Sequence, residues 1–200
     1  MLTTQELGAL LLFASAMAFT PGPNTTLSAA LAANGGLRAA IRFVVGVPVG
    51  WGLLLLGCVA GLGAMLDAMP ALRGLVKLAG LAYMLWLAFR LARSATLARA
   101  AAAPLRVGFW QGVALQAVNI KAWMNALMIT AGWITVDAQW PQRLAVVLPL
   151  MMAYGLASNL TYALVGSALR HWLAQGRRLL WFNRCLAAVL VATAAWMARL

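Results

Sequence analysis

The chain has 200 residues, of which 64% are hydrophobic and only 9% are charged. Soluble domains carry roughly 25% charged residues, so this composition excludes an ordinary soluble fold. A formal net charge of +12 is also found in nucleic-acid-binding proteins, but here the basic residues alternate with apolar segments and form no single stripe. We therefore expect a lipid bilayer, and no nucleic acid, as a partner of this chain.

Six apolar segments follow one another along the chain, separated by short connections. A transmembrane helix needs about 20 mainly apolar residues, and every segment is at least that long. The sequence predicts an all-α membrane protein with six transmembrane helices in one domain over residues 1–200. The predicted segments are 4–34, 39–66, 71–93, 107–136, 143–169 and 178–198.

The first segment is interrupted at residues 20–24, which read Thr-Pro-Gly-Pro-Asn, inside an uncharged run over residues 7–37. Two prolines remove two backbone donors, so the helix must break there. Broken backbone at membrane depth is tolerated only where protein or a water-filled cavity satisfies the freed carbonyls. Interrupted helices commonly build transporter substrate sites. A turn outside the membrane is the alternative, and the missing flanking charges favour a break within the membrane.

The second half-helix is expected to begin near Asn24, a residue type that caps helix N-termini well. Free N–H groups and the positive end of the helix dipole attract an anionic group such as a carboxylate, and the Asn24 amide can donate to the same group. We therefore expect a substrate clamp. Its residues are Thr20, Pro21, Gly22, Pro23 and Asn24.

The second segment carries four glycines that form the Gly-xxx-Gly spacing twice. Small residues four apart let membrane helices approach closely, so we expect these glycines to serve helix packing. They are Gly46, Gly50, Gly57 and Gly61.

The fourth segment holds Gln111, Gln116, Asn119 and Lys121, four polar side chains in eleven positions. Lys121 is the only charge deep inside an apolar segment, where insertion scales put lysine at about 2.5–3.5 kcal/mol unfavourable. Three roles stay open for it. The first role is a fixed cation that binds the substrate. The second is a proton carrier, because burial disfavours the charged form of the amine. The third is a structural group that donates to the carbonyls freed at the first break.

The fifth segment carries a polar stripe, whereas the sixth is almost wholly apolar and is predicted to be a packing helix. Tyr154, Ser158, Thr161 and Tyr162 follow an i, i+4, i+7, i+8 pattern, so they share one helix face. A polar stripe on a membrane helix faces other helices or water. We expect Tyr154, Ser158 and Asn159 to line the substrate path.

The two halves of the chain show a weak duplication. Segments one and four each contain an apolar run broken by a polar cluster, centred on Asn24 and on Asn119. Three segments per half is an odd number, so the second half would be inverted relative to the first. We expect a 3+3 inverted repeat with halves 1–103 and 104–200 and the site where the halves meet.

Basic residues are unevenly divided between the connections. Ten lie in the first, third and fifth connections and four on the opposite side, which by the positive-inside rule predicts both termini outside. The ten are Arg38, Arg42, Arg90, Arg93, Arg99, Arg106, Arg170, Arg177, Arg178 and Arg184; the four are Arg73, Lys77, Arg143 and Arg199.

Catalytic motifs are absent from the sequence. It contains no Gly-x-Ser-x-Gly, no His-Glu-x-x-His, no Walker loop and no carboxylate pair, and its only histidine, His171, lies at a segment end. Glu6, Asp67 and Asp137 lie near the outer ends of segments, so no carboxylate is expected at the midplane, which disfavours metal transport and a simple Asp/Glu proton relay. We expect no enzyme, no cofactor and no metal.

Motifs spread over nearly the full length resemble the LysE/RhtB family of amino-acid exporters. The family usually reads Asn-Pro-Lys in the fourth segment, and Ile120 replaces that proline here. The stretch 109–121 looks most like the cysteine/O-acetylserine exporter branch, which also lacks the proline. The resemblance rests on Phe19-Thr20-Pro21-Gly22-Pro23-Asn24, Gly35, Gly46-x-x-x-Gly50, Gly80-x-x-Tyr83 and Asn119-x-Lys121-Ala122.

The resemblance implies a multi-pass protein of the bacterial inner membrane that exports amino acids by a proton-driven secondary mechanism. In that membrane, the charge distribution described above predicts periplasmic termini. The residues themselves favour a zwitterion, since a helix N-terminus and Lys121 suit its carboxylate, while Tyr154, Tyr162 and neighbouring carbonyls could receive its ammonium. The scarcity of midplane acids favours small neutral amino acids. A small-ion exporter or channel and a non-transporting assembly subunit remain as alternatives, and the oligomeric state stays open between a monomer and a homo-oligomer.

Overall fold

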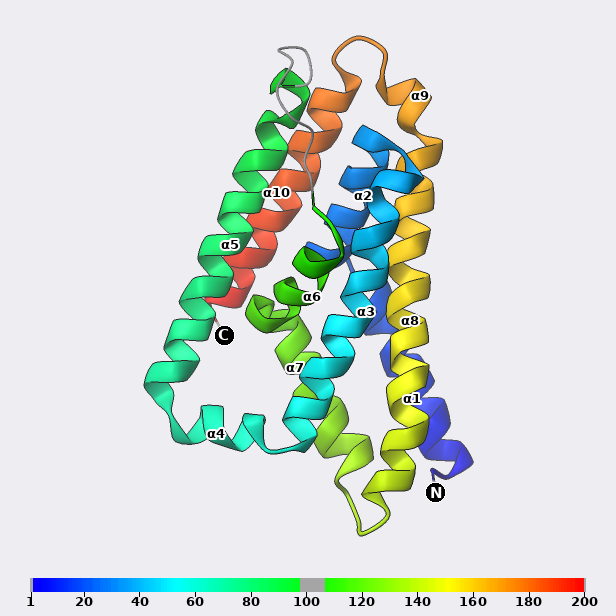
Figure 1. Ribbon diagram of the computed structural model, residues 1–200, viewed down its shortest axis with the longest axis vertical. Helices are drawn as coiled ribbons and strands as arrows, with labels where there is room; N and C mark the ends of the chain where they lie inside the picture. The colour runs from blue at the N-terminus through cyan, green and yellow to red at the C-terminus, as the bar shows by residue number, and fades with distance from the viewer. Residues whose placement is uncertain (1, 98–106, 200) are drawn as a thin grey trace.

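The computed structural model describes residues 2–97 and 107–199, and all regular structure in these two ranges is helical (Figure 1). The prediction of an all-α fold is confirmed. Within these ranges four helices are long and apolar enough to cross a membrane. They are α3 (Leu37–Val59), α5 (Pro70–Leu97), α8 (Trp140–Ala168) and α10 (Arg178–Ala198).

The two segments predicted to be broken each consist of shorter helices. The first forms α1 (Thr4–Phe19) and α2 (Pro23–Gly35), and the fourth forms α6 (Phe109–Val118) and α7 (Ile120–Ile129), followed by one π-helical turn, η2 (Thr130–Ile134). Six crossings and an inverted repeat go beyond the four long helices and stay predictions.

The second predicted segment, 39–66, does not form one continuous helix. Helix α3 ends at Val59, and a separate short helix, α4 (Leu62–Ala68), runs across the lower end of the molecule (Figure 1). The chain turns at Gly61, whose φ of 102° lies in the left-handed region that favours glycine and commonly ends helices.

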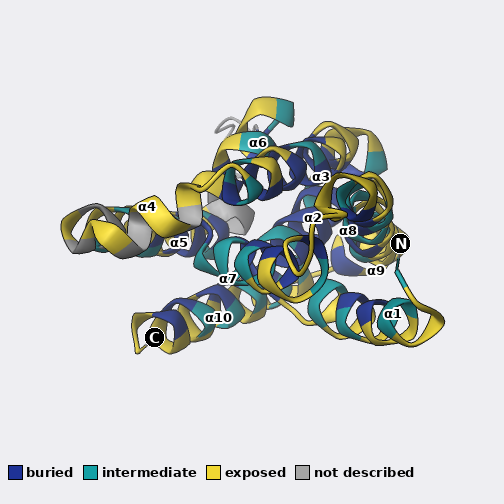
Figure 2. Cartoon of the chain, turned by 90° about the horizontal axis from the view of Figure 1, so that it is seen from below, coloured by how far each residue is buried: buried dark blue, intermediate teal, exposed yellow. Residues whose placement is uncertain are grey.

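Helix α2 occupies the centre of the fold, where it packs against α3 and α8, while α5 and α10 pair beside them (Figures 1 and 2). Ten of its thirteen residues are buried, which leaves this half of the broken segment surrounded by protein. The glycine spacing predicted to serve packing does so at Gly46 and Gly50, because a Cβ at either position would meet the backbone of α6.

The basic residues of the first, third and fifth connections lie at one end of the molecule, at the α2–α3 turn, the end of α5, the short helix α9 (Arg170–Leu173) and the start of α10 (Figure 1). Arg99 and Arg106 lie outside the described residues. Helix α8 begins at the opposite end, with Arg143 in its first turns. The division agrees with the charge asymmetry in the sequence, and the orientation of the two ends in a membrane stays a prediction.

Candidate functional site

The first break lies between Phe19, the last residue of α1, and Pro23, the first of α2. The prediction that Asn24 caps α2 was wrong, because Gly22 occupies the N-cap in extended conformation and donates its N–H to Thr25 Oγ1 at 3.0 Å. Proline has a fixed φ and no N–H to leave unpaired, so it favours the first helical position. Asn24 is thereby moved into the helix, and its amide is free to reach across the fold.

The break frees the carbonyls at the end of α1, and three of them accept hydrogen bonds from side chains. Two donors lie one turn apart on α8 and the third comes from α7, so both helices hold the broken segment. This pairing is what a low-dielectric environment requires of interrupted backbone. The bonds run from Ser158 Oγ to Ala18 O (2.5 Å), from Tyr162 OH to Phe19 O (2.9 Å) and from Lys121 Nζ to Thr20 O (2.8 Å).

Lys121 therefore satisfies a carbonyl at the first break, which is the structural role that the sequence left open for it. Its ammonium lies at the C-terminal end of α1, where the helix dipole favours a positive charge. It also lies against Gly22, where an added Cβ would be 3.5 Å from Nζ. An ammonium has three N–H donors and the bond to Thr20 uses one, so Lys121 also has donors for a ligand.

The second break lies at Asn119, which ends α6 and precedes α7 although Ile120 stands where the resemblance predicts a proline. Asn119 has φ −89° and ψ 99°, outside the helical region, and its carbonyl accepts the first bonds of α7. Trp123 Nε1 donates to the freed Ala117 carbonyl at 2.8 Å. This break forms without a proline.

Side-chain amides join the two breaks. Asn24 Nδ2 donates to Gln116 Oε1 at 3.0 Å, and Gln116 Nε2 donates back to Asn24 Oδ1 at 3.1 Å. Asn119 Nδ2 approaches Asn24 Oδ1 at 3.5 Å. The two Asn-centred clusters of the sequence thus meet in space.

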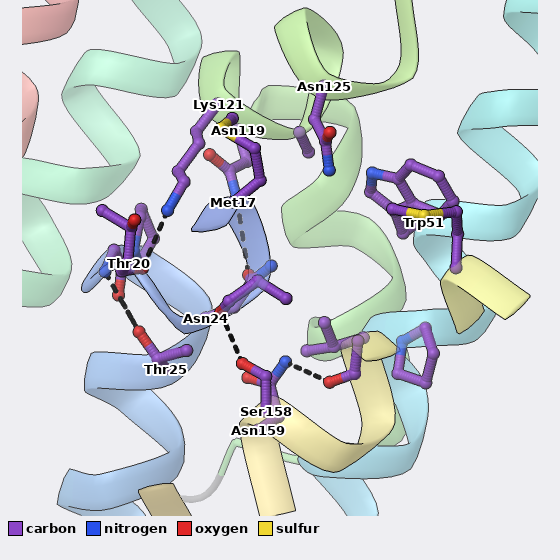
Figure 3. A pocket seen from close by; sticks show the side chains of 18 residues that line it. Met17, Thr20, Asn24, Thr25, Trp51, Asn119, Lys121, Asn125, Ser158 and Asn159 are labelled. Carbon is purple, nitrogen blue, oxygen red and sulfur yellow. Dashed lines mark hydrogen bonds between the residues drawn. The ribbon is translucent and has the colours of Figure 1, made fainter. Parts of the chain in front are cut away.

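A pocket of about 80 Å³ lies where α1, α2, α3, α7 and α8 converge at these breaks (Figure 3). This volume holds several waters or one small solute and is far below that of a drug-sized site. Lys121 is the one charged side chain among its lining residues, and no carboxylate lines it. Eight predicted site residues line the pocket: Thr20, Gly22, Pro23, Asn24, Asn119, Lys121, Ser158 and Asn159.

Four predicted site residues lie outside the pocket or use their side chains to bond neighbouring helices. Pro21 and Tyr154 are not among the lining residues, and Tyr154 packs against the apolar cluster around Met151. Asn159 accepts from Ser28 Oγ at 3.0 Å and donates to the Gly155 carbonyl, so it fastens α2 to α8. Ser158, as described above, is bonded to α1.

Three buried polar atoms of the lining residues have no hydrogen-bond partner among the described residues. They are Trp51 Nε1, Asn119 Oδ1 and Asn125 Oδ1. The great majority of buried polar atoms in proteins are paired, so three unpaired ones around one pocket indicate a place for a polar ligand. The ligand would need both donors and acceptors.

Sequence reasoning missed Trp51 and Asn125. Asn125 follows Lys121 by four residues, a spacing that places both on one helix face, so this signal was present. Trp51 reads as one more apolar residue in an apolar segment, and nothing in its local sequence distinguishes it.

A family model and the similar proteins of known name agree on one type of transporter. A family model described as LysE type translocator matches residues 15–199. A cysteine/O-acetylserine efflux protein of Klebsiella pneumoniae is 32% identical over 95% of each chain. Proteins of the same name from Salmonella typhimurium and Escherichia coli K12 are 33% and 31% identical, over 87% of this chain and 88% of theirs. No solved structure matches.

These matches confirm the family resemblance and its cysteine/O-acetylserine branch. The expectation that the chain is not an enzyme is confirmed as well, because the family and the relatives are described as translocators and efflux proteins. With the four long apolar helices, they support a multi-pass membrane protein.

Proposed function

This chain belongs to the LysE type translocator family, and on that premise we propose that it exports small neutral amino acids or their derivatives across the bacterial inner membrane. Cysteine and O-acetylserine, named for its relatives, belong to this substrate class. The observation that carries the proposal is the pocket at the two breaks, where donors and unpaired acceptors face one small space.

The start of α2 is the proposed carboxylate end of the pocket. The first hydrogen bond of this helix runs from Thr26 N to Gly22 O at 2.9 Å, so the N–H groups of Asn24 and Thr25 precede it. Such N–H groups, with the positive end of the helix dipole, bind anions. Lys121 Nζ, beside Gly22, adds a full positive charge.

Asn119 Oδ1 is the proposed acceptor for the substrate ammonium. Asn119 is only 2% exposed and this oxygen has no partner within the described ranges, so an ammonium donor would satisfy it. Tyr154, an earlier candidate for this role, lies off the pocket, and Tyr162 donates to the Phe19 carbonyl. A zwitterion offers opposite charges on adjacent carbons, which matches one short pocket with a donor end and an acceptor.

The proposed transport cycle is alternating access in a single domain over residues 1–200. Two broken segments and four long helices would give six crossings, arranged as inverted halves 1–103 and 104–200 with the breaks at their meeting point. The basic end would face the cytoplasm, which leaves both termini periplasmic.

A proton gradient is the proposed driving force, as the family resemblance implies. Lys121 is the single ionisable side chain among the lining residues, which makes it the candidate proton carrier. We expect a protonophore to stop export from energised vesicles. Export that persists after the gradient collapses would exclude this coupling.

The test of the function is uptake of labelled amino acids into inside-out membrane vesicles, where export appears as accumulation. We expect Asn24→Ala and Lys121→Ala to reduce accumulation to the level of empty vesicles at unchanged protein content. Lys77→Ala, near the start of α5 and outside the pocket, is the matched control and should transport normally. Wild-type accumulation in the two pocket variants would refute the clamp.

The same vesicles distinguish the alternatives. Ion flux without amino-acid flux would indicate a small-ion exporter or channel. Absence of both, with Lys121 cross-linking to another membrane protein, would indicate an assembly subunit.

A further inference from the structure

Trp51 on α3 and Asn125 on α7 flank the side of the pocket opposite Thr20, and the indole nitrogen of Trp51 is turned toward Asn125 (Figure 3). This side is separate from the start of α2, where the carboxylate is proposed to bind. An amino acid held by its carboxylate and ammonium would therefore present its side chain here.

The two residues offer opposite hydrogen-bonding groups. Trp51 Nε1 can only donate and Asn125 Oδ1 can only accept, and neither has a partner in the part of the chain that the structure describes. Trp51 is 8% exposed and its ring packs in the apolar cluster with Leu54 and Leu55. Its N–H therefore has a fixed direction and cannot turn to solvent.

Apolar residues also line the pocket near Trp51, because Pro48 lies one turn before it on α3 and Met151 of α8 belongs to the same apolar cluster. A cationic substrate side chain would lose its hydration here without gaining a countercharge, because no carboxylate is among the lining residues. An aliphatic side chain would leave both the donor and the acceptor unpaired, which costs free energy. A hydroxyl, a thiol or a carboxamide can accept from one residue and donate to the other.

We propose that Trp51 and Asn125 select the substrate side chain and that they favour a small neutral group able both to accept and to donate a hydrogen bond. This inference rests on the proposed function and names its substrate class. It ranks hydroxyl and thiol amino acids above aliphatic ones of the same size.

The test compares two substrates of nearly equal size, L-serine and L-2-aminobutyrate, in inside-out vesicles that contain the full chain. A site built to hydrogen-bond a hydroxyl discriminates strongly against the analogue that lacks it, so we expect wild-type protein to prefer serine by at least about tenfold. In Trp51→Phe and Asn125→Leu the preference should fall to within about threefold, because the group that reads the hydroxyl is gone.

The ratio of the two rates is the readout, so partial loss of folded protein in either variant does not affect the conclusion. Trp86→Phe, on the exposed face of α5, is the matched control and should keep the wild-type ratio. Equal loss of both substrates in the two pocket variants would overturn the inference, since Trp51 and Asn125 would then be a structural pair. Wild-type transport of both substrates at equal rates would overturn it too and leave the proposed function standing. Transport of no amino acid by wild-type protein would instead refute the function itself.

Discussion

Two polar clusters lie between helices in this chain, and they differ in how completely their hydrogen bonds are made. Arg143 is 6% exposed, and its guanidinium pairs with Glu6 and Asp137 at 2.9 Å each and donates to the Trp133 carbonyl. Around the pocket, Trp51 and its neighbours keep unpaired buried atoms. The first cluster is complete without a ligand, whereas a ligand would complete the second.

This difference distinguishes polar groups that hold helices together from polar groups that are available to a ligand. Arg143 ties the first turn of α1 and the loop before α8 to α8 itself, so its charges hold elements together. The pocket leaves polar groups open at some cost in stability, as binding sites do. We therefore expect changes at Arg143 to affect folding and changes in the pocket to affect transport.

The largest expected effect on stability is that of Arg143→Gln. This substitution removes the ion pairs to Glu6 and Asp137 and the hydrogen bond to the Trp133 carbonyl together, so the links that hold α1 and the loop before α8 to α8 are lost. We expect a clear fall in the melting temperature of the purified protein in detergent. Arg199→Gln, just after α10, is the control and should leave the melting temperature unchanged. If both variants melt at the same temperature, Arg143 does not have the structural role described here.

The second effect concerns the break at Asn119. Gly80 on α5 lies against the carbonyl of Val118, the last residue of α6, where an added Cβ would clash. Overpacking of this kind costs about 1–3 kcal/mol, so Gly80→Ala should lower both the melting temperature and transport. Gly74→Ala, on the same helix with nothing near the added Cβ, is the control. Normal transport in Gly80→Ala would mean that the second break does not depend on this contact.

A smaller effect on stability is expected at the pocket. Asn119→Leu removes an unpaired buried oxygen together with the long contact to Asn24, so the free energy of unfolding should change by no more than about 1 kcal/mol. Transport should nevertheless be lost, because the proposed ammonium acceptor is gone. A variant that melts far below the wild type would show that this amide is structural, and the comparison with Arg143 would fail.

The smallest effect is a pH dependence at Asp137. The backbone N–H of Gln139 and the guanidinium of Arg143 hold the pKa of this carboxyl below its usual value of about 3.9. Its contribution to stability is therefore fully present above that value and is lost as the pH falls through the lower pKa of the folded protein. We expect the difference in melting temperature between wild type and Asp137→Asn to stay constant from neutral pH to about pH 5 and to shrink below about pH 4. A difference that shrinks near neutral pH would contradict this assignment.

Much of this arrangement could be predicted from local sequence. The prolines around Gly22 predicted the first break, and the isolated charge of Lys121 predicted a partner such as a carbonyl at that break. The two Asn-centred clusters in the sequence predicted that Asn24 and Asn119 would lie close together, and they do. Each of these signals is a helix-breaking, charged or polar residue inside an apolar segment.

The rest depends on contacts between distant parts of the chain. Glu6 and Arg143 are 137 positions apart, and no local pattern pairs them. The indole N–H of Trp51 became a site feature only because the fold left it without a partner. Gly22 displaced Asn24 from the cap because the proline between them fixed the helix start, a competition that residue preferences alone did not resolve.

The most direct test of the central claim, that the pocket at the broken helices binds a zwitterion, is equilibrium binding of labelled L-serine to the purified protein. The competitors are L-serine itself and two analogues with one charge each, ethanolamine and 3-hydroxypropionate. Since both ends of the pocket are needed, we expect serine to displace the label and each analogue to require at least about tenfold more, which corresponds to a loss of about 1.4 kcal/mol. Displacement by either analogue as effectively as by serine would contradict the account.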